Sequence, residues 1–417
     1  MNPRFMNPRW SYILALPRWM GRWLLIALIT GVPIGTASAF FLIALDWATG
    51  NRQQHPLLIW GLPIAGLIVG GCFLRFGNSV ERGNNLILDE IHQPRETIPF
   101  RMMPMVLIGT VISHLFGASV GREGTAIQMG GAIADQCAHR FHLKGETRRI
   151  LLVMGIGAGF ASVFGTPLAG TVFGLEVLAI GAMRYDALFP CMAASLIAHA
   201  TCVLWGAHHT HYPTAIVPPL SFAPAVAVVI AGALFGLMAR LFSWLTQAIA
   251  STLKALIPWA PLRPFVGGAL IALLVMNITG LDRYIGLGEP IIESALHSPV
   301  ALYDTLGKLG FTVLSLGSGF KGGEVTPLFY IGTTLGNAVA QLAHQPVALL
   351  ASVGFVAVFA GAANTPLAST LMAIELFGPA IAPYALMGCV ISYLFSGPRG
   401  IYAAQRVERH KWPGIAP

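Results

Sequence analysis

The sequence contains Gly155-Ile-Gly-Ala-Gly-Phe-Ala-Ser-Val-Phe-Gly-Thr-Pro-Leu-Ala-Gly170, and it repeats this pattern as Gly354-Phe-Val-Ala-Val-Phe-Ala-Gly-Ala-Ala-Asn-Thr-Pro-Leu-Ala-Ser369. Aligned residues lie 199 positions apart throughout. Each copy continues to a glutamate nine residues after its proline, at Glu176 and Glu375. A match that extends through a whole helix at one offset indicates that the chain consists of two related halves.

A second, shorter pair of motifs lies upstream of the first. Gly121-Arg-Glu-Gly-Thr125 corresponds to Gly322-Gly-Glu-Val-Thr326, so both halves carry the same two motifs in the same order. Apolar segments interrupted by glycine and proline at matching places in two halves point to the binding site of a transporter. We expect halves at residues 1–210 and 211–417 with no separate soluble domain, and the sequence leaves parallel and inverted repeats open.

The composition is that of a membrane protein. Of 417 residues, 55% are hydrophobic and only 10% are charged, with a mean hydropathy of +0.70. Apolar stretches approach the roughly 20 residues that a bilayer-spanning helix needs, and we expect about ten to twelve spans. Strand-like alternation is missing, so the predicted fold class is an all-α integral membrane protein.

The net charge of +8 has a topological explanation. Basic residues cluster in three places, which predicts that both termini and the middle loop are cytoplasmic, in a bacterial plasma (inner) membrane. No nucleic-acid motif accompanies the charge, so no nucleic-acid partner is expected. The clusters are Arg4, Arg9, Arg18 and Arg22, then Arg140, Lys144, Arg148 and Arg149, and finally Arg406, Arg409 and Lys411.

Three Thr-Pro pairs stand directly before apolar helical runs. Threonine is a good N-cap and proline a good first helical residue, so the pairs predict three helix starts within the membrane. A helix N-terminus carries a partial positive charge and free N–H donors, which suit a small anion. The pairs are Thr166-Pro167, Thr326-Pro327 and Thr365-Pro366.

Glu123 and Glu324 are the leading candidates for coupling an anion to protons. Ionisable residues at membrane depth cost roughly 2.5–3.5 kcal/mol and mark ion or proton paths. A carboxylate beside an anion site competes with the anion when charged and leaves when protonated. The alternative is that each only forms an ion pair, with Arg122 or Lys321. For Glu176 and Glu375, deep in helices, we expect structural roles.

These motifs resemble the CLC family of anion channels and proton-coupled antiporters, through Gly121-Arg-Glu-Gly-Thr-Ala-Ile-Gln128, Gly165-Thr-Pro-Leu-Ala-Gly170 and the Gly-Gly-Glu-Val-Thr-Pro segment. The resemblance runs nearly end to end. It implies a CLC-type fold of two inverted halves with many tilted and broken helices. It also implies a homodimer in the lipid bilayer, one pore per subunit, and Glu123 as the external gating glutamate.

Departures from the chloride members resemble the fluoride-exporting subclass. Arg82-Gly-Asn-Asn-Leu86 places Asn84 where chloride members use an anion-coordinating serine, and Phe320-Lys-Gly-Gly-Glu-Val-Thr-Pro327 adds Glu324 and Thr326. Tyr402 matches the central pore tyrosine of the family. Val177 occupies the position of the internal proton glutamate of chloride antiporters, yet the subclass keeps proton coupling without it.

Fluoride is small and strongly hydrated, so a selective site must offer strong donors. The expected function is fluoride/proton exchange conferring fluoride resistance, without cofactor, metal or enzymatic activity. A chloride/proton antiporter or a passive chloride channel on the same fold is the alternative. Asn84 has a second interpretation as a helix cap, which is favoured for Asn85. The expected anion-binding residues are Asn84, Thr326, Tyr402, Gly121, Gly124, Gly322 and Gly323.

Other patterns are set aside. Gly117-Ala-Ser-Val-Gly121 fits a protease nucleophile motif, and with His199 it permits an intramembrane serine protease, but Ser119 is better explained as a small packing residue. Two groups of possible metal ligands are interpreted as solvated loop residues because they lack matched partners elsewhere. The groups are Asp89, Glu90 and His92, and then His208, His209 and His211.

Overall fold

The computed structural model describes residues 8–210, 212 and 217–412. Arg4 and His211 lie outside these residues, and His211 is the first residue of the expected second half. The described residues form sixteen α-helices, α1 (Pro8–Gln54), α2 (Leu62–Phe76), α3 (Asn84–His92), α4 (Met102–Phe116), α5 (Glu123–Arg140), α6 (Glu146–Phe164), α7 (Pro167–Glu176), α8 (Leu188–Leu204), α9 (Phe222–Leu256), α10 (Leu262–Asn277), α11 (Glu289–His297), α12 (Asp304–Ser318), α13 (Val325–Ala343), α14 (Val347–Ala363), α15 (Pro366–Phe377) and α16 (Ala382–Phe395).

Strand structure is minimal. The described residues hold two strands of two residues each, β1 (Ala179–Ile180) and β2 (Arg406–Val407), which pair in parallel. Short 3-10 helices connect some elements, namely η2 (Pro56–Gly61), η3 (Asn78–Val80), η4 (Tyr185–Ala187), η5 (Leu281–Tyr284) and η6 (Pro379–Ile381). The fold is therefore all-α.

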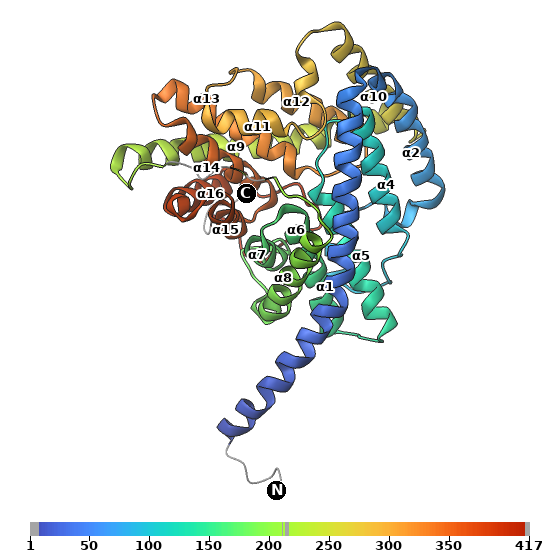
Figure 1. Cartoon of the computed structure of the whole chain (residues 1–417), viewed down its shortest axis with the longest axis vertical. Coiled ribbons are helices and arrows are strands. Elements are labelled where there is room, and N and C mark those ends of the chain that lie inside the picture. Colours follow the sequence, from blue (N-terminus) through green and yellow to red (C-terminus); the bar gives the residue numbers. More distant parts are fainter. Residues whose placement is uncertain (1–7, 211, 213–216, 413–417) are drawn as a thin grey trace.

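The helices of the second half follow those of the first in the same order. A long helix packs against the eighth helix in each series, α1 on α8 and α9 on α16, while α5 packs on α6 and α13 on α14. In Figure 1, α1 runs from the N-terminus upward between α5 and α6, and the orange and red helices of the second half lie to its left, above α6, α7 and α8. The sequence repeat thus corresponds to a repeat of packed helices.

Small residues allow the closest of these contacts. A Cβ atom on Gly130 would lie 2.2 Å from the carbonyl oxygen of Gly155, and one on Gly332 would lie 2.0 Å from that of Gly354. Both pairs join the fifth and sixth helices of their series. Lipid supplies no hydrophobic force between helices, so packing of this kind holds them together.

Helix lengths correct the expected number of full spans. Within the described residues, only five helices are long and apolar enough to cross a bilayer, and five further apolar helices have 10 to 17 residues. The long helix α1 continues through two prolines, Pro17 and Pro33. The expectation of ten to twelve full-length spans is therefore wrong, whereas broken and short helices are as expected.

Helices α7 and α15 cap each other's N-termini through a glutamate near their own C-terminal ends. The Glu375 carboxylate accepts hydrogen bonds from the backbone N–H groups of Leu168 (2.9 Å) and Ala169 (2.8 Å) at the start of α7. Glu176 accepts from Leu367 (3.1 Å) and Ala368 (2.8 Å) at the start of α15 in the same way. The reciprocal pattern gives both glutamates the structural role expected of them.

This capping also corrects one expectation about the Thr-Pro pairs. Helices α7 and α15 begin at Pro167 and Pro366 as predicted, with Thr166 and Thr365 in the N-cap position. Neither threonine side chain makes the cap hydrogen bond, and both hydroxyls are buried without a partner. The amides that we expected to remain free for an anion are occupied by carboxylates at these two starts.

Candidate functional site

The second pair of motifs meets at the centre of the molecule. Gly121 N–H donates to the Gly323 carbonyl (2.6 Å) and Gly323 N–H donates to the Gly121 carbonyl (2.7 Å). Helix α5 begins two residues after Gly121 and α13 two residues after Gly323, so both helix N-termini start beside this bridge. Two positive helix ends from opposite halves therefore lie close together.

The Glu123 carboxylate occupies the N-terminus of α13. The Thr326 hydroxyl donates to it at 2.6 Å and 2.8 Å, and the Thr326 backbone N–H donates at 3.1 Å. The Glu123 side chain has no exposed surface, and the nearest cationic atom, Arg122 Nε, lies 3.5 Å from Oε1. The closest partner of Glu123 is thus the opposite half, so the alternative of a simple ion pair with Arg122 does not describe it.

A cavity of about 220 Å³ lies close to Glu123, because Thr125 and Glu324 line it, but the Glu123 carboxylate itself is not part of its lining. Asn84, Glu324 and Tyr402 line it, and each has a buried side-chain oxygen without a hydrogen-bond partner, namely Oδ1, Oε2 and Oη. Buried polar atoms are nearly always paired with protein, water or ligand. Three unpaired atoms around one cavity therefore indicate a place where a polar ligand or water is held.

Of the glycines in the two motifs, Gly322 lines the cavity and Gly124 lies close to two of its lining side chains. A Cβ atom on Gly124 would lie 3.4 Å from both Asn84 Nδ2 and Glu324 Oε2, so both groups lie close to this glycine. Gly322 lines the cavity and has φ +155°, and a Cβ there would lie 2.4 Å from Val120 Cγ2. A larger residue at position 322 would thus collide with its surroundings.

The structure corrects three expectations about single residues. Thr326 is the second residue of α13, since Glu324 takes the N-cap position, and its hydroxyl donates to Glu123. Asn84 is the first residue of α3 and makes no cap hydrogen bond, which removes the capping alternative. Asn85 instead accepts a hydrogen bond from Ala404 N–H at 2.9 Å, which is a structural role. Tyr402 is 4% exposed.

Comparison with known proteins identifies the family. The model of a family described as voltage gated chloride channel matches residues 65–397. The chain is 58% identical over 398 residues to a chloride/fluoride channel protein of Pseudomonas syringae pv. tomato, covering 94% of this chain and 88% of that protein. The chain belongs to the CLC family.

Other CLC proteins are more distant. The H(+)/Cl(−) exchange transporter ClcA of Cronobacter sakazakii is 25% identical over 382 residues, which cover 85% of this chain and 81% of that one. A crystal structure of a CLC-type fluoride/proton antiporter matches with a TM-score of 0.90 and 34% identity, over 93% of this chain and 98% of that one. A slow cyanobacterial Cl−/H+ antiporter shares the fold, with a TM-score of 0.81 at 22% identity. The CLC fold and an integral membrane location follow.

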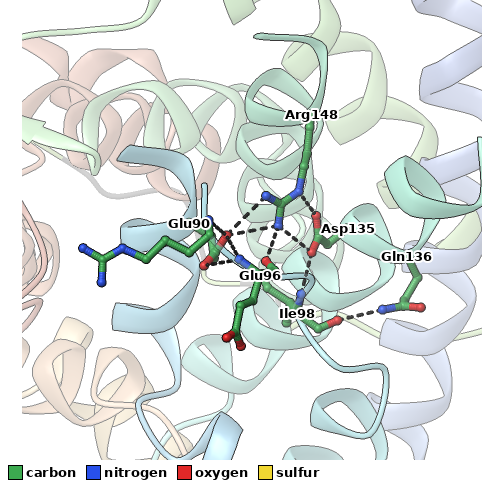
Figure 2. Close-up of polar contacts among 7 residues, drawn as sticks. Glu90, Glu96, Ile98, Asp135, Gln136 and Arg148 are labelled. Carbon is green, nitrogen blue, oxygen red and sulfur yellow. Dashed lines mark hydrogen bonds and ion pairs between the residues drawn. The ribbon is translucent and has the colours of Figure 1, made fainter. Parts of the chain in front are cut away.

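One buried ionic cluster was missed in the sequence of this CLC chain. The Arg148 guanidinium donates to both Asp135 carboxylate oxygens (2.6 Å and 2.9 Å), to Glu90 Oε2 (3.2 Å) and to the Glu96 carbonyl (2.7 Å). Figure 2 shows these groups converging on Arg148. The expected loop position of Arg148 is wrong, because this residue lies in the first turn of α6. The expectation that Glu90 is a solvated loop residue is also wrong, because it lies in α3, is 5% exposed and contributes to a cluster joining α3, α5 and α6.

The cluster positions the helix that carries Asn84. Glu90 and Asp135 also accept backbone N–H groups of the segment between α3 and α4, from Arg95 (2.9 Å) and Ile98 (2.6 Å) respectively. Helix α3 is nine residues long, so anchoring of its C-terminal half also fixes its first residue, Asn84. A network of this kind is hard to see in a sequence because its members lie up to 58 residues apart.

Replacement of Arg148 with methionine is expected to lower the free energy of unfolding by about 3–5 kcal/mol, because Asp135 and Glu90 would remain as buried carboxylates without a cation. Thermal unfolding in detergent measures the change. The matched control is Arg149→Met, which breaks an exposed pair with Glu146 and should cost less than about 1 kcal/mol. Equal, small changes in the two variants would contradict the account of the cluster.

The patterns set aside in the sequence are structural where they are described. Ser119 Oγ pairs with the Thr312 hydroxyl (2.9 Å), and no histidine hydrogen-bonds to it within the described residues. His92 Nε2 contacts the Leu178 carbonyl (2.9 Å), and His209 Nε2 contacts the Ser162 carbonyl (2.8 Å). The contacts of Ser119 are those of a packing residue.

Proposed function

We propose that this CLC chain exports fluoride in exchange for protons. The observation that carries the proposal is the position of the Glu123 carboxylate, which accepts the hydroxyl and the backbone N–H of Thr326 at the start of α13. These donors suit any small anion at a helix N-terminus. The carboxylate therefore stands in for the transported anion, and the two compete for one set of donors.

Protonation links this competition to proton transport. A protonated Glu123 carries no charge, so its attraction to the N-terminus of α13 falls and an anion can take its place. When the anion leaves, the carboxylate returns after releasing its proton. One anion movement and one proton movement then depend on the same side chain, which is the requirement for exchange.

Fluoride selectivity is proposed to depend on the cavity beside Glu123. The Asn84 amide and the Tyr402 hydroxyl are strong neutral donors at its wall, and Glu324 is a carboxyl group that donates when it is protonated. Strong donors are needed because fluoride gives up a tightly held hydration shell. The relative named as a chloride/fluoride channel protein and the fluoride/proton antiporter of similar structure support this choice of anion.

Topology and assembly complete the proposal. We infer two halves, at residues 1–210 and 211–417, related by an approximate two-fold axis, because their contacts at the Gly121–Gly323 bridge and at the Glu176 and Glu375 caps are reciprocal. The family resemblance supports an axis in the membrane plane, which makes the halves inverted. The positive clusters support cytoplasmic termini in a bacterial inner membrane. The family resemblance supports a homodimer with one pore in each subunit.

The test is fluoride and chloride efflux from proteoliposomes that contain the purified protein. An inward proton gradient should accelerate fluoride efflux. Chloride efflux under the same gradient should be much slower than fluoride efflux. Chloride efflux that equals or exceeds fluoride efflux would assign the protein to chloride transport instead. Rapid fluoride efflux that ignores the proton gradient would indicate a passive channel.

A further inference from the structure

A second cavity adjoins the one beside Glu123. It has a volume of about 360 Å³ and shares part of its wall with the first. Lys254, at the C-terminal end of α9, and Arg263, at the start of α10, line its outer part. The shared lining residues are Phe73, Glu81, Leu316, Gly319 and Lys321. The two cavities therefore meet around the Lys321 side chain.

The Lys321 side chain packs between α2 and α4. Its ammonium group lies 4.2 Å from the centre of the Phe73 ring on α2. A Cβ atom on Gly109 of α4 would lie 3.1 Å from Lys321 Cβ and 3.2 Å from Cγ, so the missing side chain there makes room for the lysine stem. A cation held over an aromatic face is fixed in place while its charge remains available to an anion.

In the part of the chain that the structure describes, Lys321 lacks an ion-pair partner, in contrast to Arg122 in the corresponding motif of the first half. In the first half, Arg122 forms ion pairs with Glu123 (3.5 Å) and Glu289 (3.2 Å). Among the ion pairs and side-chain hydrogen bonds of the described residues, none involves Lys321. Glu81 lines both cavities but lies beyond ion-pair distance. Lys321 is half-buried, and a cation at this depth without an ion-pair partner is costly unless it serves an ion.

We propose that Lys321 forms a loading site for small monovalent anions on the way from the cytoplasm to the cavity beside Glu123. Lys254 and Arg263 lie at the outer mouth, in the connection between α9 and α10, which is cytoplasmic under the proposed topology. Lys254, Arg263 and Lys321 all line the second cavity. Lys321 is the innermost of these three cations, because it also lines the cavity of Asn84 and Glu324. The inference rests on the proposed fluoride export and names the entrance that this export uses.

Lys321→Met, which keeps the stem and removes the charge, tests the loading site. Initial rates of fluoride efflux from proteoliposomes at graded internal fluoride, followed with a fluoride electrode, give KM and kcat. We expect about a tenfold higher KM with kcat changed less than about twofold, equal to a loss of ~1.4 kcal/mol in attraction. Rising ionic strength should increase KM of the wild type more steeply than KM of the variant.

Two further variants separate charge from packing. Lys321→Arg should restore a low KM because it retains the cation, and Arg75→Met is the matched control because Arg75 is exposed on α2 and lines neither cavity. An unchanged KM in Lys321→Met, while the wild type transports fluoride, would overturn the loading site and leave the proposed function intact. Equal loss in the Met and Arg variants of folded protein would also overturn it. Absence of fluoride transport by the wild type would refute the proposed function itself.

Discussion

Glu123→Gln is expected to abolish proton coupling. Glutamine is almost the same size and can still accept the Thr326 hydroxyl, but it cannot carry the proton or the charge that competes with the anion. Proton movement driven by a fluoride gradient should fall to the level of protein-free liposomes, measured with a pH-sensitive dye. Any remaining fluoride flux should no longer respond to pH.

The matched control for this variant is Glu96→Gln, since Glu96 has an exposed side chain far along the sequence from the two motifs. Proton coupling in the control should equal that of the wild type. Proton-driven fluoride uptake that persists at the wild-type rate in Glu123→Gln would remove Glu123 from the coupling step.

Glu324→Ala is expected to reduce proton-coupled fluoride exchange by at least about tenfold. Its buried Oε2 atom has no partner and, like Asn84 Nδ2, lies close to Gly124, so the substitution removes a titratable group from the cavity wall. Fluoride influx into proteoliposomes under a fixed pH gradient measures the effect. Glu408→Ala, which removes an exposed carboxylate, is the control. Wild-type exchange rates in Glu324→Ala would remove the residue from the mechanism.

The sequence predicted those parts of the structure that depend on local patterns. Helices α7 and α15 begin where the Thr-Pro pairs indicated, because capping and proline preferences act within a few residues. Asn84, Gly322, Glu324 and Tyr402 line one cavity, whereas the other expected anion-binding residues, Thr326, Gly121, Gly124 and Gly323, do not, and anion binding by this set stays a prediction. The repeat itself was visible because both copies kept Thr-Pro-Leu-Ala, a Phe-Ala pair and the glycine that opens the pattern at one constant offset.

Contacts between distant residues could not be predicted in the same way. The choice of Thr326 as the partner of Glu123, 203 residues away, depends on how the two halves meet. The same holds for Glu375, which takes the amides at the start of α7 that we expected to be free. The Arg148 cluster was hidden for the same reason, since its carboxylates come from α3 and α5, up to 58 residues away in the sequence.

The central claim is that one carboxylate at paired helix starts binds a proton and gives way to fluoride. Uphill proton transport tests it most directly. Proteoliposomes with equal pH on both sides and high internal fluoride should take up protons against the gradient that develops, as fluoride leaves. Fluoride efflux without any proton uptake would contradict the account. In that case no pH change would develop, and an added protonophore would have none to abolish.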